Sequence, residues 1–299
     1  MKKSLVLAVI ICLSGMMFAK SGFAFLRTEK SPVVISTAQT SYLFNNSVEN
    51  IGYNPASSIG EDVFSARISY KMLDQDSDIS QLASSYREVD HQYGLCISYL
   101  YISGIEAYDV PAEEPLYEFG SRNLIASFNY ALKFQSGLKM GLTGKYLFEK
   151  IEFEDAYGFA GSLGLFREDN FIKGLNLGLA VNNVGTMSKL DTEETELPLD
   201  ALFGIGYKHE FGFDMDMNIG NSVRYLINDE DIENFTGIEL SYMKRFFIRS
   251  GYRANNEGTP FSLGIGLIFD NFAFDYSFTP FSDDEIDNSH AVSLSYKIK

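Results

Sequence analysis

The chain alternates apolar and polar residues in stretches of about ten, and the pattern recurs from Phe64 to the last residue. In the first stretch one face carries Phe64, Ala66, Ile68, Tyr70 and Met72. The other face carries Ser65, Arg67, Ser69 and Lys71. A period of two indicates β-strands with two unlike faces, and about 9 to 11 tilted residues cross a bilayer, whereas soluble strands more often stop at five or six. The pattern predicts an all-β, antiparallel transmembrane β-barrel whose polar face lines the lumen.

The first 24 residues have the features of a secretory signal peptide. Lys2 and Lys3 precede an apolar run from Leu5 to about Ala19, and small residues follow at Gly22-Phe23-Ala24. The run is shorter than the roughly 20 residues of a membrane helix. We therefore expect export, cleavage after Ala24 and localisation to the outer membrane.

Composition and charge narrow the function classes. A mean hydropathy of -0.06 with 45% hydrophobic residues is too low for a helical membrane protein but suits strands with one polar face. Aromatic residues make up 14% of the chain, as interfacial girdles require. A formal charge of -16 argues against a nucleic-acid partner.

The connections between alternating stretches are expected to be long and acidic on one side and short on the other. The long set comprises Leu73–Asp78, Ser103–Gly120, Lys150–Ala156, Thr186–Leu197, Asn228–Asn234, Asn255–Thr259 and Ser282–Ser289. This spacing predicts about 14 strands over residues 61–299, with the long loops outside and both chain ends in the periplasm. A lipocalin-like soluble barrel would also alternate, but it closes with eight strands.

Residues 25–60, between the signal peptide and the first strand, show little alternation. We expect this segment to form a plug in the lumen, and we call it the hatch. Glycine and other small residues recur on the lumen side of several strands, for example Gly164, Gly178 and Gly204. These positions either leave volume for a plug or ease strand curvature, and both explanations stay open.

Several short motifs resemble FadL-like outer-membrane proteins, specifically the PorV/PorQ family. The hatch motif is Asn54-Pro55-Ala56. The later segments are Leu177–Gly185 followed by Leu197-Pro198, then Ile248–Arg253, Ser262–Gly266 and Phe274–Pro280. Together these segments cover nearly the whole mature chain, and their order and spacing make the resemblance specific. The resemblance implies a fourteen-stranded barrel with an N-terminal hatch.

The same resemblance implies one of two functions. FadL passes long-chain fatty acids, with its hatch controlling the passage, whereas PorV proteins hold secreted proteins on their outer loops. This chain departs from the pattern in three places. Ser57 stands where a glycine follows the motif, residues 36–40 replace a glycine-rich stretch, and the last residue is Lys299 instead of an aromatic.

Charged residues of both signs recur on the predicted lumen face. They are Arg67, Lys71, Lys133, Lys139, Lys145, Glu149, Asp214, Asp216, Arg224, Glu239, Arg249, Arg253, Asp275 and Lys297. They could form a selectivity lining in which bases meet a carboxylate headgroup. They could equally be a charge-paired filling, because unpaired charge is costly where water is excluded.

The sequence contains no recognisable catalytic constellation. His91, His209 and His290 are dispersed, and no HExxH, GxSxG or metal-spaced Cys/His cluster occurs. Acidic runs such as Asp74–Asp78 lack the glycine and terminal glutamate of a calcium loop and suit solvated loop tips. We expect no enzyme, no cofactor and no metal site.

Three hypotheses remain. The first is a FadL-like channel that passes or binds small hydrophobic or amphipathic molecules, such as fatty acids, by diffusion through a hatch-gated lumen. The second is a PorV-like accessory barrel that binds secreted proteins through its outer loops, and the third is a structural surface protein or adhesin. Outer-membrane lipid is a partner in all three. A channel requires an apolar pocket that connects the outside to the hatch, whereas a dry, fully plugged lumen would argue against transport.

Overall fold

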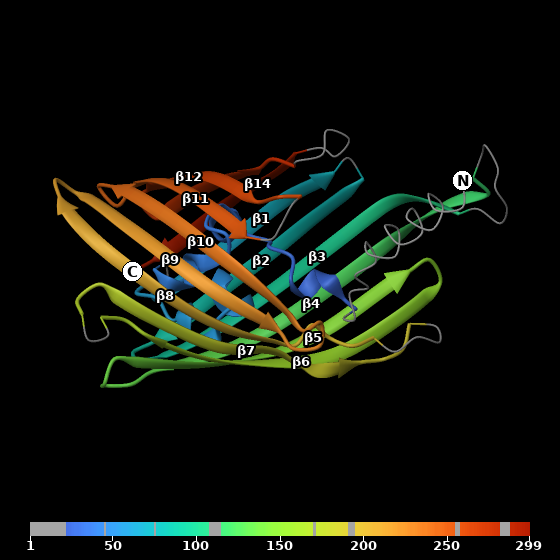
Figure 1. Ribbon diagram of the computed structural model, residues 1–299, viewed down its shortest axis with the longest axis horizontal. Helices are drawn as coiled ribbons and strands as arrows, with labels where there is room; N and C mark the ends of the chain where they lie inside the picture. The colour runs from blue at the N-terminus through green and yellow to red at the C-terminus, as the bar shows by residue number, and fades with distance from the viewer. Residues whose placement is uncertain are drawn as a thin grey trace, which may run out of the picture.

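The computed structural model describes residues 22–44, 46–74, 76–107, 115–169, 172–190, 195–254, 258–281 and 288–299. Its strands form one closed barrel in which each strand pairs antiparallel with its neighbours in sequence and β1 pairs with β14 (Figure 1). The strands are β1 (Phe64–Asp74), β2 (Ser77–Glu88), β3 (His91–Ala107), β4 (Tyr117–Lys133), β5 (Leu138–Ile151), β6 (Glu154–Arg167), β7 (Leu175–Met187), β8 (Asp200–Gly212), β9 (Met215–Leu226), β10 (Asp231–Tyr242), β11 (Phe246–Ala254), β12 (Phe261–Phe269), β13 (Phe272–Thr279) and β14 (Ser289–Ile298). The predicted transmembrane barrel of about 14 strands is confirmed.

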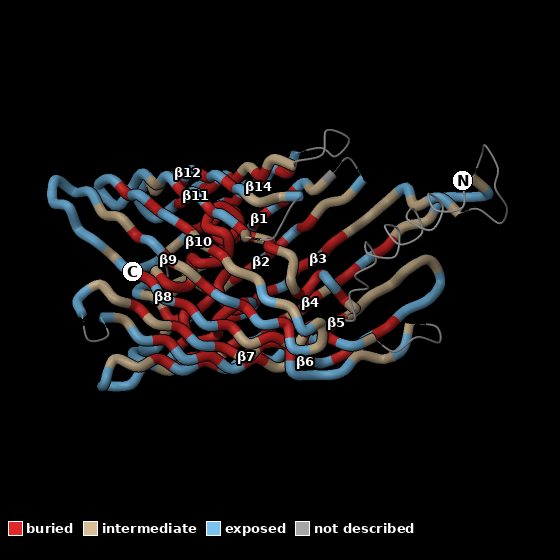
Figure 2. Tube along the Cα trace, in the orientation of Figure 1, coloured by how far each residue is buried: buried red, intermediate tan, exposed pale blue. Residues whose placement is uncertain are grey.

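The alternation translates directly into the two faces of the wall (Figure 2). In β1 Arg67, Ser69 and Lys71 are buried inside the barrel, whereas Ile68 and Tyr70 are exposed on its outer surface. Outward exposure of aliphatic and aromatic side chains continues around the strands. Such a surface is stable only against an apolar surrounding, as in the hydrocarbon of a bilayer.

The barrel has two unlike ends. The connections β3–β4, β7–β8 and β13–β14 lie at one end, called here the long-loop end, and the C-terminus lies at the opposite, short-turn end. The expected contrast between the ends is only partly correct, because strands extend into the predicted loops Leu73–Asp78 and Lys150–Ala156. Strand β2 begins three residues after β1 ends, and β6 begins three residues after β5 ends. Of their acidic residues, Asp78, Glu154 and Asp155 lie on the strands, and Asp76 and Glu152 lie between them.

The segment before β1 contains no strand. It consists of η1 (Ala24–Leu26), α2 (Pro32–Ser36), η2 (Thr40–Leu43), η3 (Val48–Gly52) and η4 (Pro55–Ser58). Proline occupies the first position of both α2 and η4, where a missing N–H costs nothing and the fixed φ suits a helix. None of the helices in the described residues is long and apolar enough to cross a membrane.

Candidate functional site

The hatch lies inside the barrel and contacts most of the wall. Helix α2 packs against β11–β14, η2 against β7–β10, η3 against β2 and β3, and η4 against β4–β6. Most residues of the hatch are buried (Figure 2). Tyr42, Leu43 and Ile51 are among its most deeply buried side chains. A folded plug therefore fills the cross-section of the lumen.

The Asn54-Pro55-Ala56 motif is the point where the hatch joins β4, β6 and β7. The Asn54 carboxamide oxygen accepts a hydrogen bond from the Ala56 amide at 3.0 Å and so caps the short helix η4. Its Nδ2 donates to the Leu165 carbonyl at 3.0 Å. Asn129 of β4 donates to the Pro55 carbonyl at 3.3 Å. One asparagine thus both starts the turn and docks it on the wall.

A row of lumen-facing glycines allows the hatch to approach the backbone of the wall. A Cβ at Gly178 would lie 2.6 Å from Cε2 of Tyr42, and a Cβ at Gly206 would lie 2.9 Å from Cβ of Leu43. A Cβ at Gly204 would overlap with the Tyr42 hydroxyl. The same close approach occurs at Gly141, Gly164, Gly237, Gly251 and Gly264. Of the two explanations for these glycines, the structure supports space for the plug.

Three wall arginines, called here the arginine clamps, hold the hatch: Arg67, Arg224 and Arg253. The Arg253 guanidinium contacts both carboxylate oxygens of Glu29, at 2.5 and 3.1 Å. It also donates to the Ile35 carbonyl at 2.9 Å. Both side chains are buried, so this bidentate pair is strengthened by the low local dielectric.

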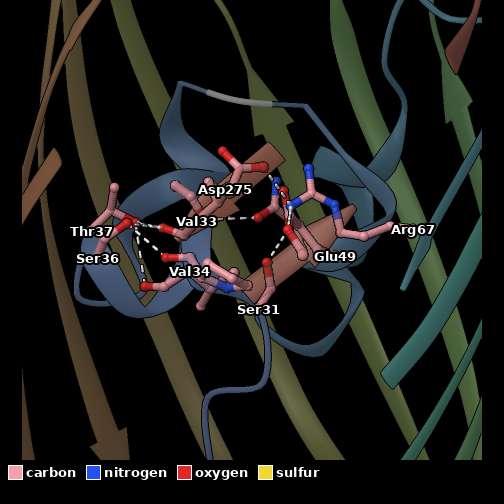
Figure 3. Close-up of polar contacts among 12 residues, drawn as sticks. Ser31, Val33, Val34, Ser36, Thr37, Glu49, Arg67 and Asp275 are labelled. Atoms are coloured by element: carbon pink, nitrogen blue, oxygen red, sulfur yellow. Dashed lines mark hydrogen bonds and ion pairs between the residues drawn. The ribbon is translucent and has the colours of Figure 1, made fainter. Parts of the chain in front are cut away.

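The Arg67 clamp belongs to a longer chain of charges (Figure 3). Its Nη1 lies 3.0 Å from Glu49 of the hatch and 3.1 Å from Asp275 of β13. Asp275 also accepts from Arg249 at 2.8 Å, and Arg249 donates to Glu239 at 2.6 Å. Ser31 of the hatch donates to the same Glu49 carboxylate. The network is a charge-paired filling that joins the hatch to β1, β10, β11 and β13.

The third clamp anchors the middle of the hatch. Arg224 of β9 donates to the Gln39 side chain and pairs with Glu233 at 3.2 Å. Gln39 has φ 64, a left-handed conformation that non-glycine residues rarely adopt and that costs energy. The contact with Arg224 is one of the interactions that hold it.

Five further predicted lumen residues are placed inside the barrel. Lys71 donates to the Glu29 carbonyl at 3.2 Å and Lys139 to the Ile59 carbonyl at 3.2 Å, so both contact the hatch. Lys145 donates to Asn183 at 2.7 Å. Asp216 lies 4.0 Å from Lys208, and Glu149 is half-buried near the long-loop end.

Asp214 does not line the lumen. It is exposed in the turn between β8 and β9, where both Phe213 and Asp214 have positive φ. Aspartate tolerates this left-handed conformation better than most residues. The prediction was wrong because the alternation was extended through a turn. Lys133 is also exposed, at the end of β4.

Sequence reasoning missed the neutral and hatch-borne partners of these charges. Asn129, Asn182 and Gln92 lie on the lumen face, and Asn182 donates to the Tyr53 carbonyl at 3.0 Å. The alternation already places them on the polar face of their strands, so their position in the pattern could have identified them as lumen residues. Glu29 and Glu49 carry no such signal, because the hatch has no period.

The long-loop end of the lumen has a different chemistry. Here wall residues turn apolar, and they surround Phe23, Phe25 and Leu26 at the start of the described chain. The strands contribute Ile79, Leu100, Ile125, Leu147 and Ala160 to this mouth cluster, and the β7–β8 connection contributes Leu197. Cleavage after Ala24 would leave Phe25 and Leu26, and burying these two side chains contributes about 3–6 kcal/mol, an upper value, at about 1.5–3 kcal/mol each. The chain fills its own apolar mouth.

Two spaces flank the hatch. Below the mouth cluster lies a cavity of about 40 Å³, lined by Lys30, Glu49, Cys96 and Lys145 among others. Burial lowers the pKa of the Lys30 ammonium to about 7. At the short-turn end a vestibule of about 610 Å³ is lined by charges of both signs. Between these two spaces the hatch and the mouth cluster occupy the lumen, and we call this arrangement the closed form.

The histidines lie apart on the outer surface. Nδ1 of His91 lies 2.6 Å from the Tyr130 hydroxyl, and Nδ1 of His290 lies 2.8 Å from the Tyr276 hydroxyl. His209 packs edge-on against Phe211. Within the described ranges, no three His, Cys, Asp or Glu residues come together as metal ligands would.

Comparison with known proteins finds similarity of fold. No family model matches the chain, and no curated protein matches it. Among solved structures, the toluene transporter TbuX of Ralstonia pickettii has a TM-score of 0.61 at 14% identity, covering 94% of this chain and 100% of that one. The Pseudomonas putida toluene transporter TodX gives 0.62 at 13% identity, covering 89% and 97%. A Pseudomonas aeruginosa FadL homologue gives 0.55 at 9% identity, covering 91% and 99%. The chain has the fold of FadL-like outer-membrane channels.

Proposed function

We propose that this protein is an outer-membrane channel that passes small hydrophobic or amphipathic molecules by diffusion, with the hatch as its gate. The observation that carries the proposal is the apolar mouth, because a lumen that only needed filling could be polar throughout. Apolar wall residues such as Ile125 and Leu147 form a site that a hydrophobic solute could occupy once Phe25 and Leu26 move out of it. The long-loop end faces outside, and the vestibule opens to the periplasm.

The fold of two toluene transporters and a FadL homologue supports this proposal. The closed form counts against an open path, so passage requires the mouth segment or the hatch to move. No nucleotide-binding or other energising motif occurs in the sequence, and the proposed passage is therefore by diffusion. A solute would displace the mouth segment only if its own burial at the mouth releases more free energy than the burial of Phe25 and Leu26 does. The natural substrate is therefore expected to bury several apolar groups.

Uptake of the apolar dye N-phenyl-1-naphthylamine into intact Gram-negative cells tests the channel. Cells that make the protein should take up the dye faster than cells that lack it. A Phe25→Ala/Leu26→Ala variant should be faster still, because the occupant of the mouth is smaller. Phe153→Ala is the matched control, since Phe153 is exposed in the β5–β6 turn. Uptake equal to that of cells without the protein, with the barrel folded in the membrane, would refute the proposal.

A second candidate is a PorV-like accessory role, which would place the chain in the PorV/PorQ branch. The closed lumen favours it, because a protein that presents its loops to a partner needs no passage. Pull-down of secreted proteins from culture medium separates the two functions. Capture that survives Phe25→Ala but fails when the loop 188–190 is changed would support the accessory role.

A further inference from the structure

The outer surface of the barrel carries a pair of cations at the edge of its apolar band. Arg122 of β4 and Lys150 of β5 are direct cross-strand partners, and Tyr101 of β3 is the partner of Arg122 on the other side. All three lie on the outward face, because their neighbours Ser121 and Asn123 are buried in the lumen. The row therefore runs Tyr101, Arg122, Lys150 across three strands.

This row lies where the hydrophobic surface ends. Toward the short-turn end the outward residues of β4 and β5 are apolar, among them Leu124, Phe128, Tyr146 and Phe148. Toward the long-loop end the β3–β4 hairpin projects beyond its neighbours (Figure 1). Aromatic and basic side chains at such a boundary lie at the depth of lipid headgroups.

The two cations have no carboxylate partner among the described residues. No ion pair within 4 Å involves either, although Asp155 is the next cross-strand neighbour of Lys150. The Arg122 guanidinium lies 5.8 Å from the centre of the Tyr101 ring. Like charges directly opposite each other destabilise a sheet unless an anion lies between them. Elsewhere in the long-loop half of the described strands, no other Arg or Lys faces outward.

A hollow of about 350 Å³ opens at this row, lined by the three residues together with Tyr117, Glu118, Phe119, Gly120, Glu152 and Phe153. The two acids are displaced from the cations toward the loops. Glu118 is four strand positions, about 13 Å, beyond Arg122. Glu152 lies in the β5–β6 turn and accepts a hydrogen bond from the Tyr117 hydroxyl. The lining next to the apolar band, Tyr101, Arg122 and Lys150, is basic and aromatic, and Asp155 of β6 lies beside Lys150 on the side away from Arg122.

We propose that Tyr101, Arg122 and Lys150 bind the phosphate of a lipid in the outer leaflet of the membrane. The guanidinium and ammonium groups pair with the phosphate oxygens, the Tyr101 hydroxyl donates a further hydrogen bond, and the acyl chains lie along the apolar strands below. The site rests on the membrane placement proposed above but not on transport. It fixes the depth and rotation of the β3–β5 side of the barrel.

Native mass spectrometry of the purified, folded protein tests the site. The probes are lipid A with both phosphates, lipid A with the phosphates removed, and inorganic phosphate alone. About 1 kcal/mol per cation corresponds to a fivefold weaker affinity for phosphorylated lipid in Arg122→Gln and about thirtyfold in Arg122→Gln/Lys150→Gln. Lys150→Arg keeps the charge and should bind as the wild type does. Arg167→Gln removes an outward arginine at the short-turn end and is the matched control.

Heat-modifiable electrophoretic mobility reports whether each variant remains a folded barrel, so loss of binding is scored only on folded protein. Three results would overturn the proposal: equal affinity in the double variant and the wild type, equal affinity for lipid A with and without phosphate, or binding of inorganic phosphate in place of the lipid. If dye uptake is absent while lipid binding behaves as described, transport fails and the lipid site stands.

Discussion

Replacing Glu29 with glutamine should release the hatch without unfolding the barrel. The side chains of Glu29 and Arg253 are 9% and 7% exposed, and their contacts are 2.5 and 3.1 Å. Removing one partner of a buried ion pair costs about 3–5 kcal/mol, and glutamine still accepts one hydrogen bond, so the low end applies. The strand ladder does not include Glu29, and the cost therefore falls on docking of the hatch.

A loss of about 3 kcal/mol raises the population of undocked hatch about a hundredfold, at 1.36 kcal/mol per factor of ten. The assay is the frequency of channel openings per protein molecule in a planar bilayer. Glu29→Gln should open about a hundred times more often than the wild type. Its heat-modifiable mobility should stay that of a folded barrel.

Glu239→Gln is the matched control. It breaks the Arg249–Glu239 pair, whose contact is 2.6 Å and whose side chains are 5% and 6% exposed, within the wall itself. Glu239 reaches the hatch only through Arg249, Asp275 and Arg67. Opening frequencies that are the same in Glu29→Gln and Glu239→Gln would refute the reasoning that the arginine clamps hold the gate.

The remaining predictions concern the fit and the pH dependence of the hatch. Gly204→Ala should expose the hatch to protease, because its Cβ would displace Tyr42, whereas Gly144→Ala, with open space around it, should not. Burial raises the pKa of Tyr42 above its ordinary 10.0. Docking of the hatch should therefore weaken as the pH rises above 10, because the phenol ionises only in the undocked hatch. Tyr42→Phe should reduce this loss of docking. That variant also loses the hydrogen bond to Ser222, worth about 1 kcal/mol. The pKa of Lys30 is about 7 in the docked hatch against an ordinary 10.5, so docking should strengthen as the pH rises through this window, and Lys30→Met should reduce this trend in protease protection.

Local pattern was enough to predict the wall but not the contents of the lumen. Alternation with a period of two decides the face of each strand residue, so Arg67, Arg249 and Asp275 were correctly placed inside. The partner of Arg253 is 224 residues away in sequence, in a segment without any period. Such a contact depends on how an aperiodic plug docks in a closed barrel, and nothing local to either residue encodes it.

The ends of the strands were also not predictable from local pattern. The acidic residues of Leu73–Asp78 and Lys150–Ala156 suggested loops, because charge in a transmembrane strand is costly. The structure removes that cost by extending the strands past the apolar band, where Asp76, Glu154 and Asp155 are exposed. Charge therefore marks the edge of the band and not the end of the strand, and the Arg122–Lys150 row lies at this edge.

Only a short piece of chain joins the apolar mouth of the lumen to the charged region of the arginine clamps. Leu26, in the apolar mouth, is three residues from Glu29, which the Arg253 clamp holds. Three residues span at most about 11 Å even when fully extended, so the mouth segment has little slack. A solute that displaces Phe25 and Leu26 must pull on Glu29, and the gain at the mouth is opposed by the ion pair at the clamp. If the opening of the two parts is coupled in this way, Glu29→Gln should also speed dye uptake in cells. Uptake that responds to Phe25→Ala/Leu26→Ala but not to Glu29→Gln would show that the mouth opens while the hatch stays docked.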